Sequence, residues 1–314
     1  MIGTITLNPC VDKTLVIDEF TYGGMNRVIE KRKDISGKGV NVSIVLTQIG
    51  VAVLTFGIYY KKGSEAFING LEEIGIKYKG IMADGELREN IKVLDINTNI
   101  TTELNQKGDF IDNNILNRLE QQLEQVMDDI DVLVITGSVP QGVGLDYYRK
   151  LIEKANAKKI KCILDAEGEL LLEGMKAKPY LIKPNLYEFE TVFGLKTKTN
   201  EDMVEKCKEI ISEGIEVVCL SMGERGAIIV DKNEAYICKP TSIQVKSTQG
   251  AGDSLVAGIC CAIEKGLPIC EMLKYGVSAA QGSLIREGTQ LCTIEGFERF
   301  KEIVTVEKIE QKRK

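Results

Sequence analysis

Asp253 stands where an apolar helical pattern begins, directly after the small residues Gly250, Ala251 and Gly252. Small residues at a helix N-terminus leave several backbone N–H groups unpaired and reachable. Those groups and the helix dipole suit a multiply charged oxyanion such as a phosphate. A carboxylate there would repel the anion, unless it takes a proton from a hydroxyl that attacks the phosphate. The segment therefore predicts phosphate chemistry; the alternative is an ordinary acidic N-cap after a glycine turn.

A second glycine-containing segment, Ser36-Gly-Lys-Gly-Val-Asn41, precedes another apolar helical pattern that ends at Gly50. Lys38 and Asn41 lie among glycines, which gives a polar surface suited to a hydroxylated, anionic ligand. The alternative is a helix entry with a solvated lysine.

The absence of histidine narrows the chemistry that these segments can perform. A Ser-His-Asp or Cys-His mechanism is excluded, and so is histidine ligation of zinc. Any general base must be a carboxylate, lysine, tyrosine or cysteine. A kinase with an aspartate base meets that limit.

Composition indicates a soluble enzyme. The chain has 314 residues, is 44% hydrophobic and has a net charge of −6, which allows one large core and argues against a nucleic-acid or membrane-surface partner. No apolar run reaches the roughly 20 residues that span a bilayer, and the N-terminus does not read as a signal peptide. Nine cysteines without a CxxC spacing are typical of a reduced protein, so a cytoplasmic location is expected.

Short apolar runs alternate with amphipathic helical patterns, which predicts a doubly wound α/β fold with a mostly parallel sheet. The expected core strands are Gly3 to Leu7, Val53 to Ile58, Val132 to Thr136, Lys161 to Asp165, Tyr180 to Lys183 and Val217 to Ser221. In such folds ligands bind outside the carboxyl ends of the strands. Polar motifs follow several of these ends, at Ser138, Asp165, Lys183 and Ser221.

Two segments break the alternation. Residues 11–32 contain a Gly23-Gly24 turn, and Asn90 to Asn105 reads as a hairpin. We expect the two excursions to pair into a small β-sheet. The predicted division is a core of residues 1–10, 33–87 and 106–314, with residues 11–32 and 88–105 as an inserted β lid.

Taken together, the motifs resemble those of the ribokinase-like sugar kinases, the phosphofructokinase-B family, along nearly the whole chain. The motifs that follow the family's order and spacing are Thr6 to Asp12, Phe20 to Arg27, Arg88 to Lys92, Thr136 to Pro140, Lys183 to Glu188 and Ser221 to Gly226. Two of them, Phe20 to Arg27 and Arg88 to Lys92, resemble the 1-phosphofructokinase branch. The GxxxxGK[ST] loop of the P-loop enzymes is absent.

The resemblance implies a small sheet that covers the sugar, with a homodimer through the lid as an allowed assembly. It implies sugar or phosphate contacts for Asp12, Arg27, Gly37, Lys38, Gly39, Asn41, Arg88, Asn90 and Ser138. A planar guanidinium such as that of Arg88 can hold two phosphate oxygens at once. The alternatives are a turn aspartate at position 12 and a solvated edge charge at position 88.

For the nucleotide, the resemblance implies contacts with ATP from Lys183, Asn185, Ser221, Met222, Gly223, Glu224, Arg225, Gly226 and Gly252. Glu188 is implied to hold magnesium indirectly, through water. Asn185 and Glu188 could instead be an N-cap and an acidic first turn. The segment Ser221 to Gly226 could be a plain strand-to-strand turn.

The implied reaction is ATP-dependent, magnesium-assisted phosphorylation of a ketose phosphate, with Asp253 as general base and Gly250, Ala251 and Gly252 as the anion hole. Arg88-x-Asn90-x-Lys92 and Asn105 favour fructose 1-phosphate, which would give fructose 1,6-bisphosphate. Tagatose 6-phosphate, giving tagatose 1,6-bisphosphate, stays open. A non-catalytic sugar-phosphate binder is a more remote alternative. Two departures from the family pattern, Ser36 before Gly37 and Asn105-Gln-Lys-Gly108-Asp after the hairpin, fall at the sugar end.

Overall fold

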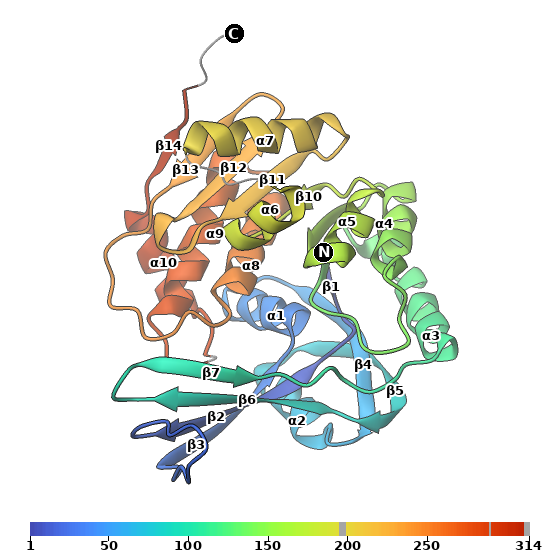
Figure 1. Cartoon of the computed structure of the whole chain (residues 1–314). Coiled ribbons are helices and arrows are strands. Elements are labelled where there is room, and N and C mark those ends of the chain that lie inside the picture. Colours follow the sequence, from blue (N-terminus) through green and yellow to red (C-terminus); the bar gives the residue numbers. More distant parts are fainter. Residues whose placement is uncertain (195–198, 289, 311–314) are drawn as a thin grey trace.

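A long mixed β-sheet runs through the molecule (Figure 1), and the computed structural model describes residues 1–194, 199–288 and 290–310. Its strand order is β14-β13-β12-β11-β10-β9-β8-β1-β4-β5. The strands are β1 (Ile2–Thr6), β4 (Val53–Lys62), β5 (Lys77–Glu86), β8 (Val132–Thr136), β9 (Lys161–Asp165), β10 (Leu181–Ile182), β11 (Val217–Ser221), β12 (Ala227–Asp231), β13 (Ala235–Cys238) and β14 (Val306–Lys308). Pairs from β5 to β11 are parallel, and those from β11 to β14 are antiparallel. The predicted doubly wound, mostly parallel sheet is confirmed.

Every residue of β1 and of β8 is buried, which shows that both faces of this sheet are covered. The helices are α1 (Lys38–Gln48), α2 (Glu65–Ile74), α3 (Asn113–Glu124), α4 (Tyr147–Ala157), α5 (Gly168–Met175), α6 (Leu186–Phe193), α7 (Asn200–Ser212), α8 (Ala251–Glu264), α9 (Ile269–Leu284) and α10 (Ile294–Ile303), with short 3-10 turns η1 (Met127–Asp129) and η2 (Gly223–Arg225). Within the described residues, no helix combines the length and the apolar character that crossing a membrane requires.

Two elements differ from the sequence expectation. The spacing of apolar residues from Ile115 to Ile130 predicts one amphipathic helix, but α3 ends at Glu124 and the turn η1 follows. Asp128 and Asp129 lie in that last part, and acidic side chains are unfavourable at a helix C-terminus. The strand expected from Tyr180 to Lys183 is shorter, since only Leu181 and Ile182 pair with both neighbouring strands.

A second, four-stranded sheet has the order β3-β2-β6-β7 and lies across one end of the main sheet (Figure 1). Its strands are β2 (Cys10–Ile17), β3 (Glu30–Ser36), β6 (Arg88–Asp95) and β7 (Ile100–Leu104). β2 pairs with β6 in parallel, so the two excursions do form one small sheet. β3 continues to Ser36, past the boundary at residue 32 that the sequence suggested. The use of this sheet as a lid stays a prediction.

The close contact between α8 and α9 sets the position of the α8 N-terminus. A β-carbon on Gly258 would lie 2.3 Å from the carbonyl oxygen of Tyr275 and 2.8 Å from the Cα of Gly276. Both contacts are with backbone, which cannot rotate away. Only a glycine therefore lets α8 approach α9 this closely.

Gly258→Ala should destabilise the fold by about 1–3 kcal/mol, the usual range for overpacking a core. Urea unfolding would measure the loss. Glu153→Ala, on the exposed face of α4, is the control and should change stability by less than about 0.5 kcal/mol. Equal unfolding midpoints for the two variants would show that α8 and α9 can separate without cost.

Candidate active site

The N-terminus of α8 is held in a conformation that favours glycine. Gly250 is its N-cap, with φ of 70° in the left-handed region. The Gly250 carbonyl accepts hydrogen bonds from the backbone N–H of Ser254 at 2.9 Å and from its hydroxyl at 2.8 Å. The Ser254 hydroxyl in turn lies 2.6 Å from that of Ser283. The first N–H groups of the helix have no intrahelical acceptor, so this end can bind an anion.

Asp253 lies in the first turn of α8 and is buried. The N-cap is Gly250 and not Asp253, so the alternative of an acidic N-cap is wrong. Instead its Oδ2 accepts a hydrogen bond of 2.7 Å from Nδ2 of Asn41, in α1. Burial raises the pKa of Asp253 to about 6, against the opposing charge of Lys38. A carboxylate with a raised pKa is a better proton acceptor than an ordinary one.

The glycines at the start of α1 allow that helix to approach the end of β1. Gly37 is the N-cap of α1 with φ of 136°, and a β-carbon on it would lie 2.9 Å from Cγ2 of Thr6. A β-carbon on Gly39 would lie 2.6 Å from the carbonyl oxygen of Ile5. The close approach places Asn41 within reach of Asp253, which joins the two glycine-containing motifs in one site.

A buried ion pair lies beside the α8 N-terminus. Lys183 Nζ is 3.1 Å from Oδ1 of Asp165, and Thr136 donates a hydrogen bond of 3.1 Å to the other carboxylate oxygen. Burial opposes ionisation of Asp165, but Lys183 and Lys38 outweigh it and lower the pKa of Asp165. A β-carbon on Gly252 would lie 3.7 Å from Lys183 Nζ, so this ammonium group faces the predicted anion hole.

Lys38 adds a second cation to this group. Its Nζ lies 2.9 Å from Oε1 of Glu167, and the charge of Asp165 raises the pKa of Lys38. Burial opposes the charge of Lys183, but Asp165 outweighs it and raises the pKa of Lys183. Both lysines are therefore charged at neutral pH, next to a helix end that favours anions.

The predicted sugar end lies in the small sheet. Asp12 is buried within β2 and pairs in register with Asn90 of β6, so the alternative of a turn aspartate is wrong. Its Oδ1 accepts a hydrogen bond of 3.1 Å from Asn90, and its Oδ2 is 2.8 Å from Nζ of Lys92. Lys92 was not among the predicted sugar contacts, although the pattern Arg88-x-Asn90-x-Lys92 puts it on the same strand face. Its period-two spacing from Arg88 and Asn90 was the signal.

Arg88 ties the small sheet to the main body. Its Nε and Nη2 donate to the carbonyl oxygen of Asn8, at 3.2 and 2.8 Å, and its Nη1 donates to that of Gln106 at 3.0 Å. It is therefore not a solvated edge charge. Asn8 also donates to the hydroxyl of Ser138 at 3.0 Å, which brings Ser138 to the same place. Arg27 is exposed between β2 and β3, with no hydrogen bond or ion pair seen to any described residue.

Asn185 and Glu188 form a capping box at the start of α6. Oδ1 of Asn185 accepts from the N–H of Glu188, and Oε2 of Glu188 accepts from that of Asn185, both at 2.8 Å. Asn185 is thus an N-cap and Glu188 an acidic residue of the first turn, as the alternative interpretation of the sequence had it. Burial raises the pKa of the Glu188 carboxyl. No group of three or more acidic or cysteine side chains that could enclose a metal occurs among the described residues.

The segment Ser221 to Gly226 joins the antiparallel strands β11 and β12 through η2. It is therefore a strand-to-strand turn, which was the alternative interpretation of this segment. An isolated parallel bridge places Ser221 beside Asn185. Gly226 has φ of 90°, and a β-carbon on it would lie 2.0 Å from the carbonyl oxygen of Cys238. The turn is therefore tightly folded next to the start of α6.

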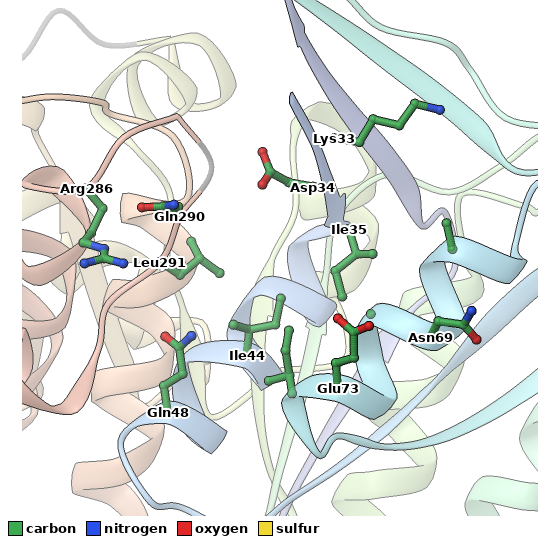
Figure 2. Close-up of a pocket in the computed structure, with 13 residues that line it drawn as sticks. Lys33, Asp34, Ile35, Ile44, Gln48, Asn69, Glu73, Arg286, Gln290 and Leu291 are labelled. Carbon is green, nitrogen blue, oxygen red and sulfur yellow. The ribbon is translucent and has the colours of Figure 1, made fainter. Parts of the chain in front are cut away.

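A hollow of about 610 Å³ lies apart from these residues, between β3, α1, α2 and the segment that follows α9. Figure 2 shows Asp34, Gln48, Glu73, Arg286 and Gln290 around it. None of the predicted site residues lines it, so we do not include it in the candidate site.

Several known proteins are similar to this chain over most of its length. A family model described as "pfkB family carbohydrate kinase" matches residues 5–295. A curated 1-phosphofructokinase of Bacillus subtilis is 32% identical over 91% of this chain and 93% of its own. The solved phosphofructokinase-2 from Escherichia coli in complex with substrates and products superposes with a TM-score of 0.91 at 25% identity, over 96% of this chain and 98% of that one. A ribokinase from Thermotoga maritima, at 19% identity and a TM-score of 0.77 over 96% of this chain and 99% of its own, shares the fold.

Asp253→Asn should stabilise the folded protein at alkaline pH. The pKa of Asp253 is about 6 in the folded chain against an ordinary value of 3.8, so ionisation of Asp253 lowers the free energy of unfolding. This loss begins above about pH 4 and reaches its full size above about pH 6. The expected gain at pH 8 is about 1–3 kcal/mol, and it should shrink as the pH falls towards 4. Denaturant unfolding at several pH values measures it, with the exposed Asp129→Asn as control. A gain that does not depend on pH would contradict the assignment.

Proposed function

Because the chain belongs to the pfkB family of carbohydrate kinases and is a phosphotransferase with an alcohol acceptor, we propose that it phosphorylates fructose 1-phosphate to fructose 1,6-bisphosphate, with ATP as donor. The observation that carries the proposal is the buried Asp253, held by Asn41 beside a helix N-terminus and two lysines. Its relative from Bacillus subtilis is named 1-phosphofructokinase, which supports this choice of sugar phosphate.

In the proposed reaction Asp253 accepts the proton of the sugar hydroxyl as that oxygen attacks the γ-phosphorus. The new O–P bond forms while the bond to the bridging oxygen breaks, and ADP leaves with the electron pair. The backbone N–H groups of Gly250, Ala251 and Gly252 stabilise charge on the transferring group. Lys183, whose Nζ faces Gly252, adds positive charge there. Positioning and electrostatics carry most of such a transfer.

The nucleotide would lie along the ends of β10 and β11. Lys183, Asn185, Gly252 and the segment Ser221 to Gly226 are the proposed contacts. Magnesium, when bound, would neutralise charge on the phosphates. Because Mg²⁺ keeps several waters and takes phosphate oxygens as ligands, a single buried carboxylate such as Glu188 fits an indirect role.

The sugar would lie between the small sheet and α1. Asp12, Asn41 and Asn90 would bind ring hydroxyls. The existing phosphate would meet Arg88 and Lys38, and Arg27 would reach it from the β2–β3 connection. Gly37, Gly39 and Ser138 would complete the surface. Arg88 would share its donors between the phosphate and the two carbonyls that it holds.

The substrate preference tests the proposal. With ATP and magnesium, we expect fructose 1-phosphate to have the higher kcat/KM, by roughly ten- to a hundredfold over tagatose 6-phosphate, since one unpaired buried polar group costs about 1–3 kcal/mol. A coupled ADP assay over both phosphates and the free sugars measures this. A higher value for tagatose 6-phosphate would reassign the substrate. Turnover of free fructose or ribose alone would exclude a sugar-phosphate kinase, and no turnover of any sugar would favour a binding protein.

The general base is tested separately. Asp253→Asn should lower kcat by at least about 10²-fold, while the affinity for ATP changes little. For the unaltered enzyme, kcat/KM should rise as the pH increases through about 6, because the carboxylate must be ionised to accept a proton. A variant with near-normal turnover would rule out Asp253 as the base.

We also propose that the small sheet forms a homodimer, as the sequence allowed. Its face opposite Asp12 carries Leu15, Ile91, Val93 and Leu104, which are neighbours in the strand register. Leu104 is 58% exposed, so this face is not covered by the chain itself. The connection between β2 and β3 adds the exposed side chains of Phe20, Tyr22, Met25, Val28 and Ile29. A broad exposed apolar surface is typical of an interface.

Light scattering should give twice the chain mass of 34.7 kDa for the unaltered protein and the single mass for Leu104→Glu, because a buried unpaired carboxylate opposes association. Ile303→Glu, at an exposed apolar position in α10, is the control and should leave the mass unchanged. A monomer in the unaltered protein at micromolar concentration would exclude the dimer.

A further inference from the structure

Gln249, the residue directly before the N-cap Gly250, is bound at both ends of its side-chain amide by the small sheet. Its Oε1 accepts a hydrogen bond of 2.7 Å from Nζ of Lys92, and its Nε2 donates to Oε1 of Glu103 at 3.3 Å. Lys92 in β6 and Glu103 in β7 are cross-strand partners. Two adjacent strands therefore hold one amide of the main body.

Lys92 connects this amide to the predicted sugar end. Its Nζ also lies 2.8 Å from Oδ2 of Asp12, and both side chains are buried. A buried ammonium group is costly unless it is paired, so Lys92 needs these two acceptors. Asp12, Lys92 and Gln249 thus form a continuous polar chain that ends at Gly250.

The next peptide, between Gly250 and Ala251, is held by the main body alone. There the Gly250 carbonyl accepts from Ser254, whose hydroxyl lies beside that of Ser283. Both serines belong to helices of the main body, α8 and α9, so their contacts do not depend on where the small sheet lies. The side-chain hydrogen bonds of Gln249 to Lys92 and Glu103 exist only when the small sheet lies against the start of α8.

We propose that Lys92, Glu103 and Gln249 form a latch that fixes the anion hole at the start of α8 when the small sheet is closed, which makes Gln249 a positioning residue for phosphoryl transfer. The inference rests on the proposed function. A sugar bound at Asp12 shares a carboxylate with Lys92 and holds the small sheet in place. The anion hole is then complete only when the acceptor is present, which limits transfer of the phosphoryl group to water.

A charge transposition tests the latch. Gln249→Glu keeps an acceptor for Lys92 but places two carboxylates together at Glu103, so kcat with the sugar phosphate should fall about tenfold while KM for ATP changes by less than about twofold. The double variant Gln249→Glu, Glu103→Gln exchanges donor and acceptor and leaves the net charge as it was. It should recover kcat to within about threefold of the original. Unaltered kcat in Gln249→Glu, or no recovery in the double variant, would overturn the latch.

A second measurement does not depend on catalysis. Amide hydrogen exchange over residues 247–254 should be faster in Gln249→Glu than in the original protein and should return towards the original rate in the double variant. Glu89→Gln, which removes a carboxylate paired with Lys33 in the same sheet, is the matched control and should leave this exchange unchanged. Equal exchange in all variants would contradict the latch. An unaltered protein that turns over no sugar phosphate would instead contradict the proposed function.

Discussion

The hydrogen bond between Asn41 and Asp253 is the contact on which the rest of the site depends. It joins residues 212 positions apart, one in α1 and one in α8. Both helices reach this position through glycines: Gly37 and Gly39 let α1 approach β1, and Gly258 lets α8 approach α9. The contact holds a buried carboxylate at a helix end that favours anions. It thereby joins the helix entry that carries Lys38 and Asn41 to the helix entry that carries Asp253.

The charges around Asp253 explain how it can stay basic among cations. Lys38 and Lys183 alone would lower its pKa and weaken it as a proton acceptor. Asp165 counters them, since its charge raises the pKa of Asp253 and its carboxylate pairs with Lys183. The two lysines are thereby kept charged for a phosphate, while burial keeps the pKa of Asp253 near 6. In the proposed mechanism, Asp165 thus lets the two lysines attract an anion while Asp253 accepts a proton.

The sequence predicted local features better than distant contacts. The strands Val132–Thr136, Lys161–Asp165 and Val217–Ser221 end where expected, because short apolar runs between polar turns mark buried parallel strands. The side-chain contacts could not be predicted. Arg88 donates to the carbonyl of Asn8, 80 residues away, and this bond follows from the parallel pairing of β2 and β6 rather than from spacing. The same pairing brings Lys92 to Asp12 and leaves Gln249 within its reach.

The most direct test of the central claim is a crystal structure with fructose 1-phosphate and a non-hydrolysable ATP analogue. The account predicts the free terminal hydroxyl of the sugar within about 3 Å of the Asp253 carboxylate, with the sugar phosphate at Arg88 and Lys38 and the γ-phosphate at the N–H groups of residues 250–252. A sugar bound with its phosphate at Asp253, or a γ-phosphate placed away from the start of α8, would contradict it.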